Sequence, residues 1–228
     1  MTERTFQGFT DETYEFFMAI AFNNNMQFFH ENHDWYLRAV RQPCLDLAAA
    51  LDNVMEKIDD EIERRPNRVV SRINRDIRFS NDKSPYRDHL WISFQRPSEE
   101  RGREPGFWFE IDAHGASWGV GAYAVTPGFL RSYRRLLLES PERVLLAAGP
   151  ALKRFELFGQ RYKRLPVPDD LRPELRPLWD LKALGFERTT DDQDLLDSPR
   201  LVDVLSDDYV QLAPMYHLMR FIRANETA

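Results

Sequence analysis

Residues 71–94 carry the densest set of functional groups in the sequence. Basic side chains alternate there with carboxylates, and a proline and an aromatic residue follow. The candidate ligand-binding residues are Arg75, Asp76, Arg78, Ser80, Asp82, Lys83, Tyr86 and Arg87. Guanidinium and ammonium groups bind phosphate or carboxylate oxygens, and a hydroxyl with turn amides can complete such a site. The segment therefore predicts binding of a small anionic ligand, phosphate- or carboxylate-bearing, by the loop of residues 75–87.

The same residue types also fit an architectural role. Asp76 and Asp82 are close enough in sequence to pair with the neighbouring cations, and such an ion-pair network would lock the loop in place. The protein would then be a structural scaffold or a protein-interaction module. Neither hypothesis names a catalytic residue. Ser80 lacks the G-x-S-x-G surroundings of a nucleophile, and Asp82 beside Lys83 is no stronger as a general base.

Four residues outside the loop are secondary candidates for the same site: Asn24, Asn25, Lys163 and Arg164. The asparagines belong to a run at 23–25 that is typical of a helix break, and the two cations also fit a solvated face. His30 and His33 have helical spacing for a metal, but an H-x-x-H pair without a placed third ligand is a weak signal. No metal site and no cofactor is predicted.

Composition limits the classes of function. The chain has 228 residues and 43% are hydrophobic, enough for a sizeable core. The net charge of −6 argues against nucleic-acid binding, and the strand aromatics such as Trp91 would stack on bases only if they were exposed. The single cysteine, Cys44, fits a reducing compartment. With no run of 18 apolar residues, we expect a cytoplasmic protein without membrane association; the oligomeric state stays open.

Periodicity predicts the elements that position the loop. Three helices are expected at about 11–22, after an N-cap at Thr10, at 26–40 and from Pro43 to about 64. Three strands, at 89–94, 106–112 and 116–125, form an antiparallel meander whose first strand follows the loop. Later elements are helices at about 127–138, 141–149, 175–181 and 199–224 and short strands at 155–158 and 183–189. The sequence thus predicts a single α+β domain over residues 1–228, with an antiparallel sheet (the meander at about 89–125 plus the short later strands) flanked by N-terminal and C-terminal helices.

The motif Arg75-Asp76-x-Arg78-Phe79-Ser80-x-Asp82-Lys83-x-Pro85-Tyr86-Arg87 resembles the R-D-x-R-F-S-x-D-K-x-P-Y-[KR] signature of a widespread microbial family of conserved hypothetical proteins, a domain of unknown function. Further landmarks occur in the same order: Phe6-x-Gly8-Phe9, Asn24-Asn25, Gly119-x-Gly121, Lys163-Arg164-x-Pro166 and Lys182. Val167-Pro168 stands where the family usually has a glycine and an aromatic residue. The resemblance spans nearly the whole chain; it implies a shared fold but no activity.

Overall fold

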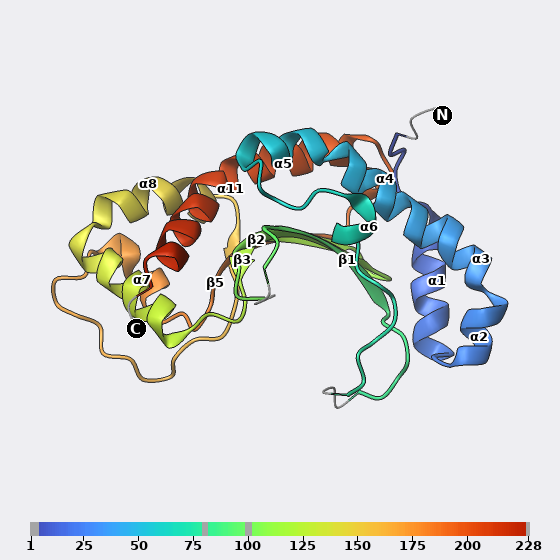
Figure 1. Ribbon diagram of the computed structural model, residues 1–228, viewed down its shortest axis with the longest axis horizontal. Helices are drawn as coiled ribbons and strands as arrows, with labels where there is room; N and C mark the ends of the chain where they lie inside the picture. The colour runs from blue at the N-terminus through green and yellow to red at the C-terminus, as the bar shows by residue number, and fades with distance from the viewer. Residues whose placement is uncertain (1–4, 79–81, 99–101, 227–228) are drawn as a thin grey trace. The chain divides into compact units, whose positions relative to one another are not determined.

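The computed structural model describes residues 5–78, 82–98 and 102–226, and it confirms the α+β class. The strands form one antiparallel sheet in the order β1-β2-β3-β5-β4 (Figure 1). Their bounds are β1 (His89–Gln95), β2 (Gly106–Asp112), β3 (Ala116–Ala122), β4 (Glu156–Leu157) and β5 (Leu184–Thr190). β4 runs antiparallel to β5, with Leu157 opposite Phe186. The predicted meander is therefore present, although its third strand ends at Ala122 and not at residue 125.

Helices stand at both ends of the chain. Their bounds are α1 (Asp11–Phe22), α2 (Met26–Glu31), α3 (His33–Tyr36), the π-helical η1 (Leu37–Arg41), α4 (Gln42–Ala50), α5 (Asp52–Ile58), α6 (Pro66–Val69), α7 (Pro127–Glu139), α8 (Pro141–Leu152), the 3-10 turn η2 (Pro173–Leu175), α9 (Arg176–Trp179), α10 (Gln193–Leu196) and α11 (Arg200–Ala224). The predicted start of α1 is confirmed, since the Thr13 hydroxyl accepts the Thr10 N–H at 3.3 Å.

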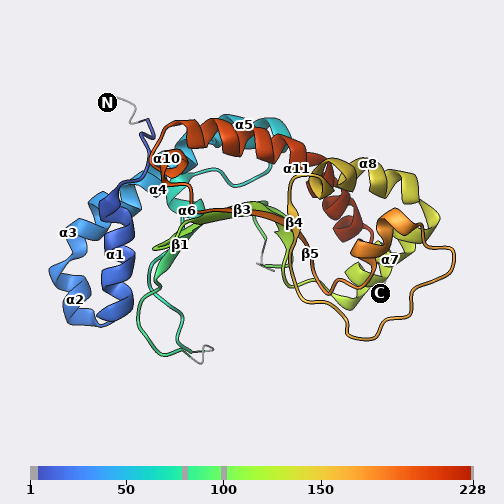
Figure 2. The ribbon, with the colours of Figure 1, turned by 180° about the vertical axis from the view of Figure 1, so that it is seen from behind.

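The chain packs as two compact units. Unit 1 holds Met1–Phe94, Trp108–Trp118 and Thr189–Ser206, and unit 2 holds Gln95–Phe107, Gly119–Arg188 and Asp207–Ala228. Each has its own aromatic core: Phe9 stacks on Phe109 in unit 1, and Phe107 packs against Tyr209 in unit 2. Within unit 2, the second half of α11 lies beside α7 and α8 (Figure 2). A single domain over residues 1–228 stays a prediction.

Pro43 does not begin a helix as predicted. The helical path continues from α3 through the π-helical turn η1 into α4, with Pro43 near the start of α4. Proline has no amide hydrogen, so it cannot donate to the Ala39 carbonyl four residues earlier. The buried Thr13 hydroxyl donates to that carbonyl instead, at 2.6 Å, and so satisfies it from another helix.

Two other helix ends differ from the prediction. The helix expected to reach residue 64 stops at Ile58, because Asp59 adopts an extended conformation. Ile62 is buried, but it lies beyond the end of the helix. Pro66 then opens the short helix α6, which the sequence did not indicate. Pro150 does not end α8, which runs on to Leu152, since a proline this close to the helix end removes only one late hydrogen bond.

Candidate functional site

The predicted site loop is a small hairpin in unit 1. The Arg75 N–H donates to the Pro85 carbonyl at 2.9 Å, and the Arg87 N–H donates to the Ile73 carbonyl at 2.8 Å. Asn74 and Tyr86 form an antiparallel bridge between these bonds. We call residues 72–88 the motif hairpin; it leads directly into β1 and projects from the start of that strand (Figure 1).

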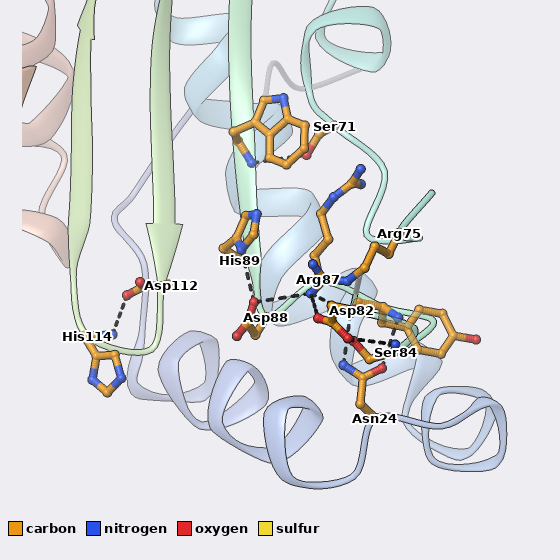
Figure 3. A network of polar contacts seen from close by, with 12 residues as sticks. Asn24, Ser71, Arg75, Asp82, Ser84, Arg87, Asp88, His89, Asp112 and His114 are labelled. Carbon is orange, nitrogen blue, oxygen red and sulfur yellow. Dashed lines mark hydrogen bonds and ion pairs between the residues drawn. The ribbon is translucent and has the colours of Figure 1, made fainter. Parts of the chain in front are cut away.

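Arg75 is the centre of the charge network in this hairpin. Its Nη2 lies 3.2 Å from Asp82 Oδ2 and 3.9 Å from Asp88 Oδ1, and it donates to the Tyr86 carbonyl at 3.3 Å (Figure 3). Only 20% of its side chain is exposed. Asp82 is itself fixed by Ser84, whose hydroxyl and N–H donate to Oδ1 and lower the pKa of Asp82. The hairpin therefore neutralises Arg75 with its own carboxylates.

Arg78 and Lys83 also bind groups of the hairpin. The Arg78 guanidinium donates to both oxygens of Asp76, at 2.9 and 2.7 Å, and this lowers the pKa of Asp76 to about 2. Lys83 Nζ donates to the Ile77 carbonyl at 2.8 Å. All these side chains are exposed, and the candidate Ser80 lies outside the described residues. Arg78 and Lys83 thus bind groups of their own local turns, whereas Arg75 binds Asp82, Asp88 and the Tyr86 carbonyl.

Arg87 crosses the two strands of the hairpin. Its Nη1 donates to the carbonyls of Arg72 and Asn74 at 2.5 and 2.7 Å, and its guanidinium lies 4.5 Å from the centre of the Trp91 ring. Burial, with a contribution from the Arg75 charge, lowers the pKa of Arg87. No carboxylate within the described ranges pairs with Arg87. Carbonyl oxygens and an aromatic face are the groups that hold this cation.

Asn24 joins the hairpin to the turn between α1 and α2. Its Nδ2 donates to the Tyr86 carbonyl and its Oδ1 accepts the Tyr86 N–H, both at 3.0 Å, so the amide pairs with this residue as a neighbouring strand would. The Tyr86 ring stacks on Phe29 at 4.2 Å. Asn25 has a separate role, because its side chain caps α2 by accepting the Phe28 N–H at 2.9 Å. The structure thus brings Asn24 and not Asn25 to the hairpin.

The other candidates take no part in the contacts described above. Lys163 and Arg164 belong to unit 2, where both are exposed and neither hydrogen-bonds nor ion-pairs with any described residue. The His33 ring packs against Phe29 at 5.5 Å. No group of three or more His, Cys, Asp and Glu side chains in the described part of the chain could hold a metal ion. Trp108 and Trp118 are buried in the core, so neither presents a face to a nucleobase.

An open hollow of about 450 Å³, which sequence reasoning missed, lies in unit 1 at the end of β2. Its lining residues are Glu110, Asp112, His114, Gly115, Ala116, Ser117, Thr189, Thr190 and Asp191. Asp112 Oδ1 accepts the N–H groups of His114 and Gly115 and so closes the turn from β2 to β3 (Figure 3). The available signal was the alternation of Glu110 and Asp112 with buried Phe109 and Ile111.

Glu110 is half-buried in this hollow, and its ionisation opposes folding. Burial raises the pKa of Glu110; the nearby His89 acts against this rise, and Asp112 adds to it. The folded protein therefore holds the proton more tightly than the unfolded chain does. Protonated Glu110 contributes stability below its ordinary pKa of 4.5, and that stability is lost as the pH rises through the folded-state value.

The Glu110→Gln variant should therefore be more stable than the parent at neutral pH, and this advantage should disappear below about pH 4. Urea unfolding at a series of pH values measures the difference. The matched control is Glu15→Gln, which removes the same charge from an exposed position in α1. An advantage that is constant with pH, or one shared by the control, would contradict this role of Glu110.

A comparison with protein families finds one matching family model. A family model described as conserved hypothetical protein (DUF2461) matches residues 12–218. The chain belongs to the DUF2461 family. This confirms the predicted membership of a domain-of-unknown-function family, and the matched range contains the whole motif hairpin and Asn24. The searches of curated proteins and of solved structures gave no match for this DUF2461 chain.

Within the described ranges, no helix is both long and apolar enough to cross a membrane.

Proposed function

We propose that the motif hairpin of this DUF2461 protein is a structural lock that holds the scaffold of unit 1. The observation that carries the proposal is the position of Arg75, which is largely buried and bound by two carboxylates and a carbonyl of its own hairpin. A cation held in this way is charge-compensated before any ligand arrives. Its contribution is therefore to the geometry of the fold.

Hydrogen bonds join the hairpin and its base to two other parts of unit 1. Just outside the hairpin, the Ser71 N–H donates to the carbonyl of Trp91 in β1 at 2.8 Å, and the Trp91 N–H donates to the Ser71 hydroxyl at 3.1 Å. Toward the helices, the Asn24 amide binds both backbone groups of Tyr86. The charge network thus stabilises a segment that connects β1 to the turn between α1 and α2.

Arg75→Met should lower the free energy of unfolding by about 2 kcal/mol, because it removes charge-assisted hydrogen bonds from a largely buried group. Urea unfolding followed by circular dichroism measures this loss. The matched control is Arg78→Met: the Arg78 side chain is 76% exposed and should leave stability unchanged, since exposed ion pairs contribute little. Equal stability of the Arg75 variant and the parent would overturn the lock.

Binding of a small phosphate- or carboxylate-bearing anion by the same hairpin is the second candidate function. Residues 72–88 contain five basic side chains (Arg72, Arg75, Arg78, Lys83 and Arg87) and three acidic ones (Asp76, Asp82 and Asp88), which gives a net charge of +2. Arg72 is exposed, and its side chain makes no hydrogen bond or ion pair to a described residue. It is the cation most available to a ligand.

A further variant, Arg72→Gln, separates the two candidates when pyrophosphate is titrated into it and into the parent by calorimetry. Arg72→Gln removes a free cation without disturbing the lock, so under our proposal both stability and pyrophosphate affinity should match those of the parent. Loss of affinity at unchanged stability would instead support the anion site and contradict a purely architectural role of the hairpin.

A further inference from the structure

A second group of cations, in unit 2, includes two that lie against one aromatic ring, and no carboxylate among the described residues ion-pairs with the group. Two short segments pair there: the Tyr162 N–H donates to the Asp180 carbonyl and the Lys182 N–H donates to the Gln160 carbonyl, both at 2.8 Å. We call the residues at this place the Tyr162 cluster, which consists of Arg134, Tyr162, Lys163, Arg164 and Lys182. The pairing fixes Tyr162 and Lys182 on the same face of the two segments.

Arg134 and Lys182 both lie against the Tyr162 ring. The Arg134 guanidinium carbon is 4.9 Å and the Lys182 Nζ is 5.4 Å from the ring centre. Arg134 is held in place by the carbonyls of Trp179 and Leu181, each at 3.2 Å. These contacts orient the guanidinium, and no described carboxylate forms an ion pair with it. Two like charges at one ring repel each other, so their proximity favours an anion between or beside them.

The carboxylate of Asp180, in the segment paired with Tyr162, is already engaged. Asp180 forms its ion pair with Arg161, which also donates to the Pro177 carbonyl at 2.9 Å. Lys163 and Arg164, which follow Tyr162 in the chain, are exposed and add two further charges without partners in the described ranges. Tyr162 itself is 37% exposed, so part of its ring remains open to solvent.

We propose that the Tyr162 cluster binds the phosphate group of a small phosphorylated molecule. The planar guanidinium of Arg134 suits two phosphate oxygens, and the ammonium of Lys182 supplies a compact second charge. The open part of the Tyr162 ring offers an apolar face for the organic portion of the same molecule. The proposed site requires no residue of the motif hairpin.

Lys182→Gln tests the proposal with least risk to folding, because Lys182 is exposed and its ammonium makes no hydrogen bond to a described residue. Inorganic pyrophosphate is titrated into the parent and the variant by calorimetry at low and at moderate salt. The parent should bind with an affinity that falls as salt rises, and Lys182→Gln should bind about tenfold more weakly. Thermal unfolding should be the same for both proteins.

The matched control is Lys153→Gln, which removes an exposed lysine of unit 2 just after α8 and should leave the affinity unchanged. Equal affinities for Lys182→Gln and Lys153→Gln, or a parent that does not bind millimolar pyrophosphate, would overturn the Tyr162 cluster as a site. Loss of binding in Arg72→Gln but not in Lys182→Gln would overturn it as well, and would assign the anion to the motif hairpin.

Discussion

Gly8→Ala is expected to destabilise the protein by about 3 kcal/mol or more, since strain and a steric clash act together. Gly8 has a φ of +109°, a conformation that residues with a side chain rarely adopt. A Cβ at this position would lie 2.2 Å from both the carbonyl carbon and the oxygen of Asp197. Because these are backbone atoms, no side-chain rotation relieves the overlap. Urea unfolding with a two-state fit measures the loss.

The clash would also open the contact that Gly8 permits. The Phe9 N–H donates to the Leu196 carbonyl at 3.0 Å, and the Tyr14 hydroxyl donates to Asp197 Oδ1 at 2.7 Å. The control is Gly149→Ala in α8, where a Cβ would meet nothing within 4 Å, and where alanine should stabilise the helix by about 0.5–1 kcal/mol. A Gly8 variant as stable as the parent would show that the segment before α1 does not depend on this close approach.

Asp208→Asn is expected to lower the free energy of unfolding by about 3 kcal/mol, because it removes the buried carboxylate that pairs with two arginines in unit 2. Asp208 lies on α11 and is fully buried. Its Oδ1 is 2.7 Å from Arg154 Nη2, and its Oδ2 is 3.1 Å from Arg188 Nη1. Asparagine keeps the shape of the side chain but cannot neutralise two guanidinium groups. Urea unfolding of the purified variant and of the parent measures this difference in the free energy of unfolding.

The neighbouring Asp207→Asn is a closely matched control, because it makes the same substitution one position away, on the exposed side of α11. It should leave stability unchanged. If the Asp208 and Asp207 variants unfold at the same urea concentration, the pairing of Asp208 with the two arginines contributes no net stability. Its Coulomb energy would then only balance the cost of burying the carboxylate.

Several features could be predicted because their cause is local in the sequence. Thr10 and Thr13 are three residues apart, and they form the start of α1 as expected. The run 23–25 ends α1, as expected, because asparagine bonds to nearby backbone groups. Alternation of aromatic and polar residues predicted the three strands of the meander, since successive side chains on a strand point to opposite faces.

The partners of the motif cations could only in part be predicted. Composition indicated both an anion site and an ion-pair network, and the sequence could not decide between them. Arg78 pairs with Asp76 two residues away, as a local network requires. Arg75 instead pairs with Asp82 and Asp88, which reach it only because the hairpin folds back on itself.

The sequence by itself determined the α+β class, the order of the strands along the chain, the start of the first helix and the membership of the DUF2461 family. The tertiary structure alone decided that Asn24 binds Tyr86, 62 residues away, that Gly8 meets Asp197, and that Asp208 is buried between two arginines. The physical reason is the range of the interactions. Caps and strand alternation depend on neighbours within a few residues, whereas the partner of a buried polar group depends on which distant segments the core brings together.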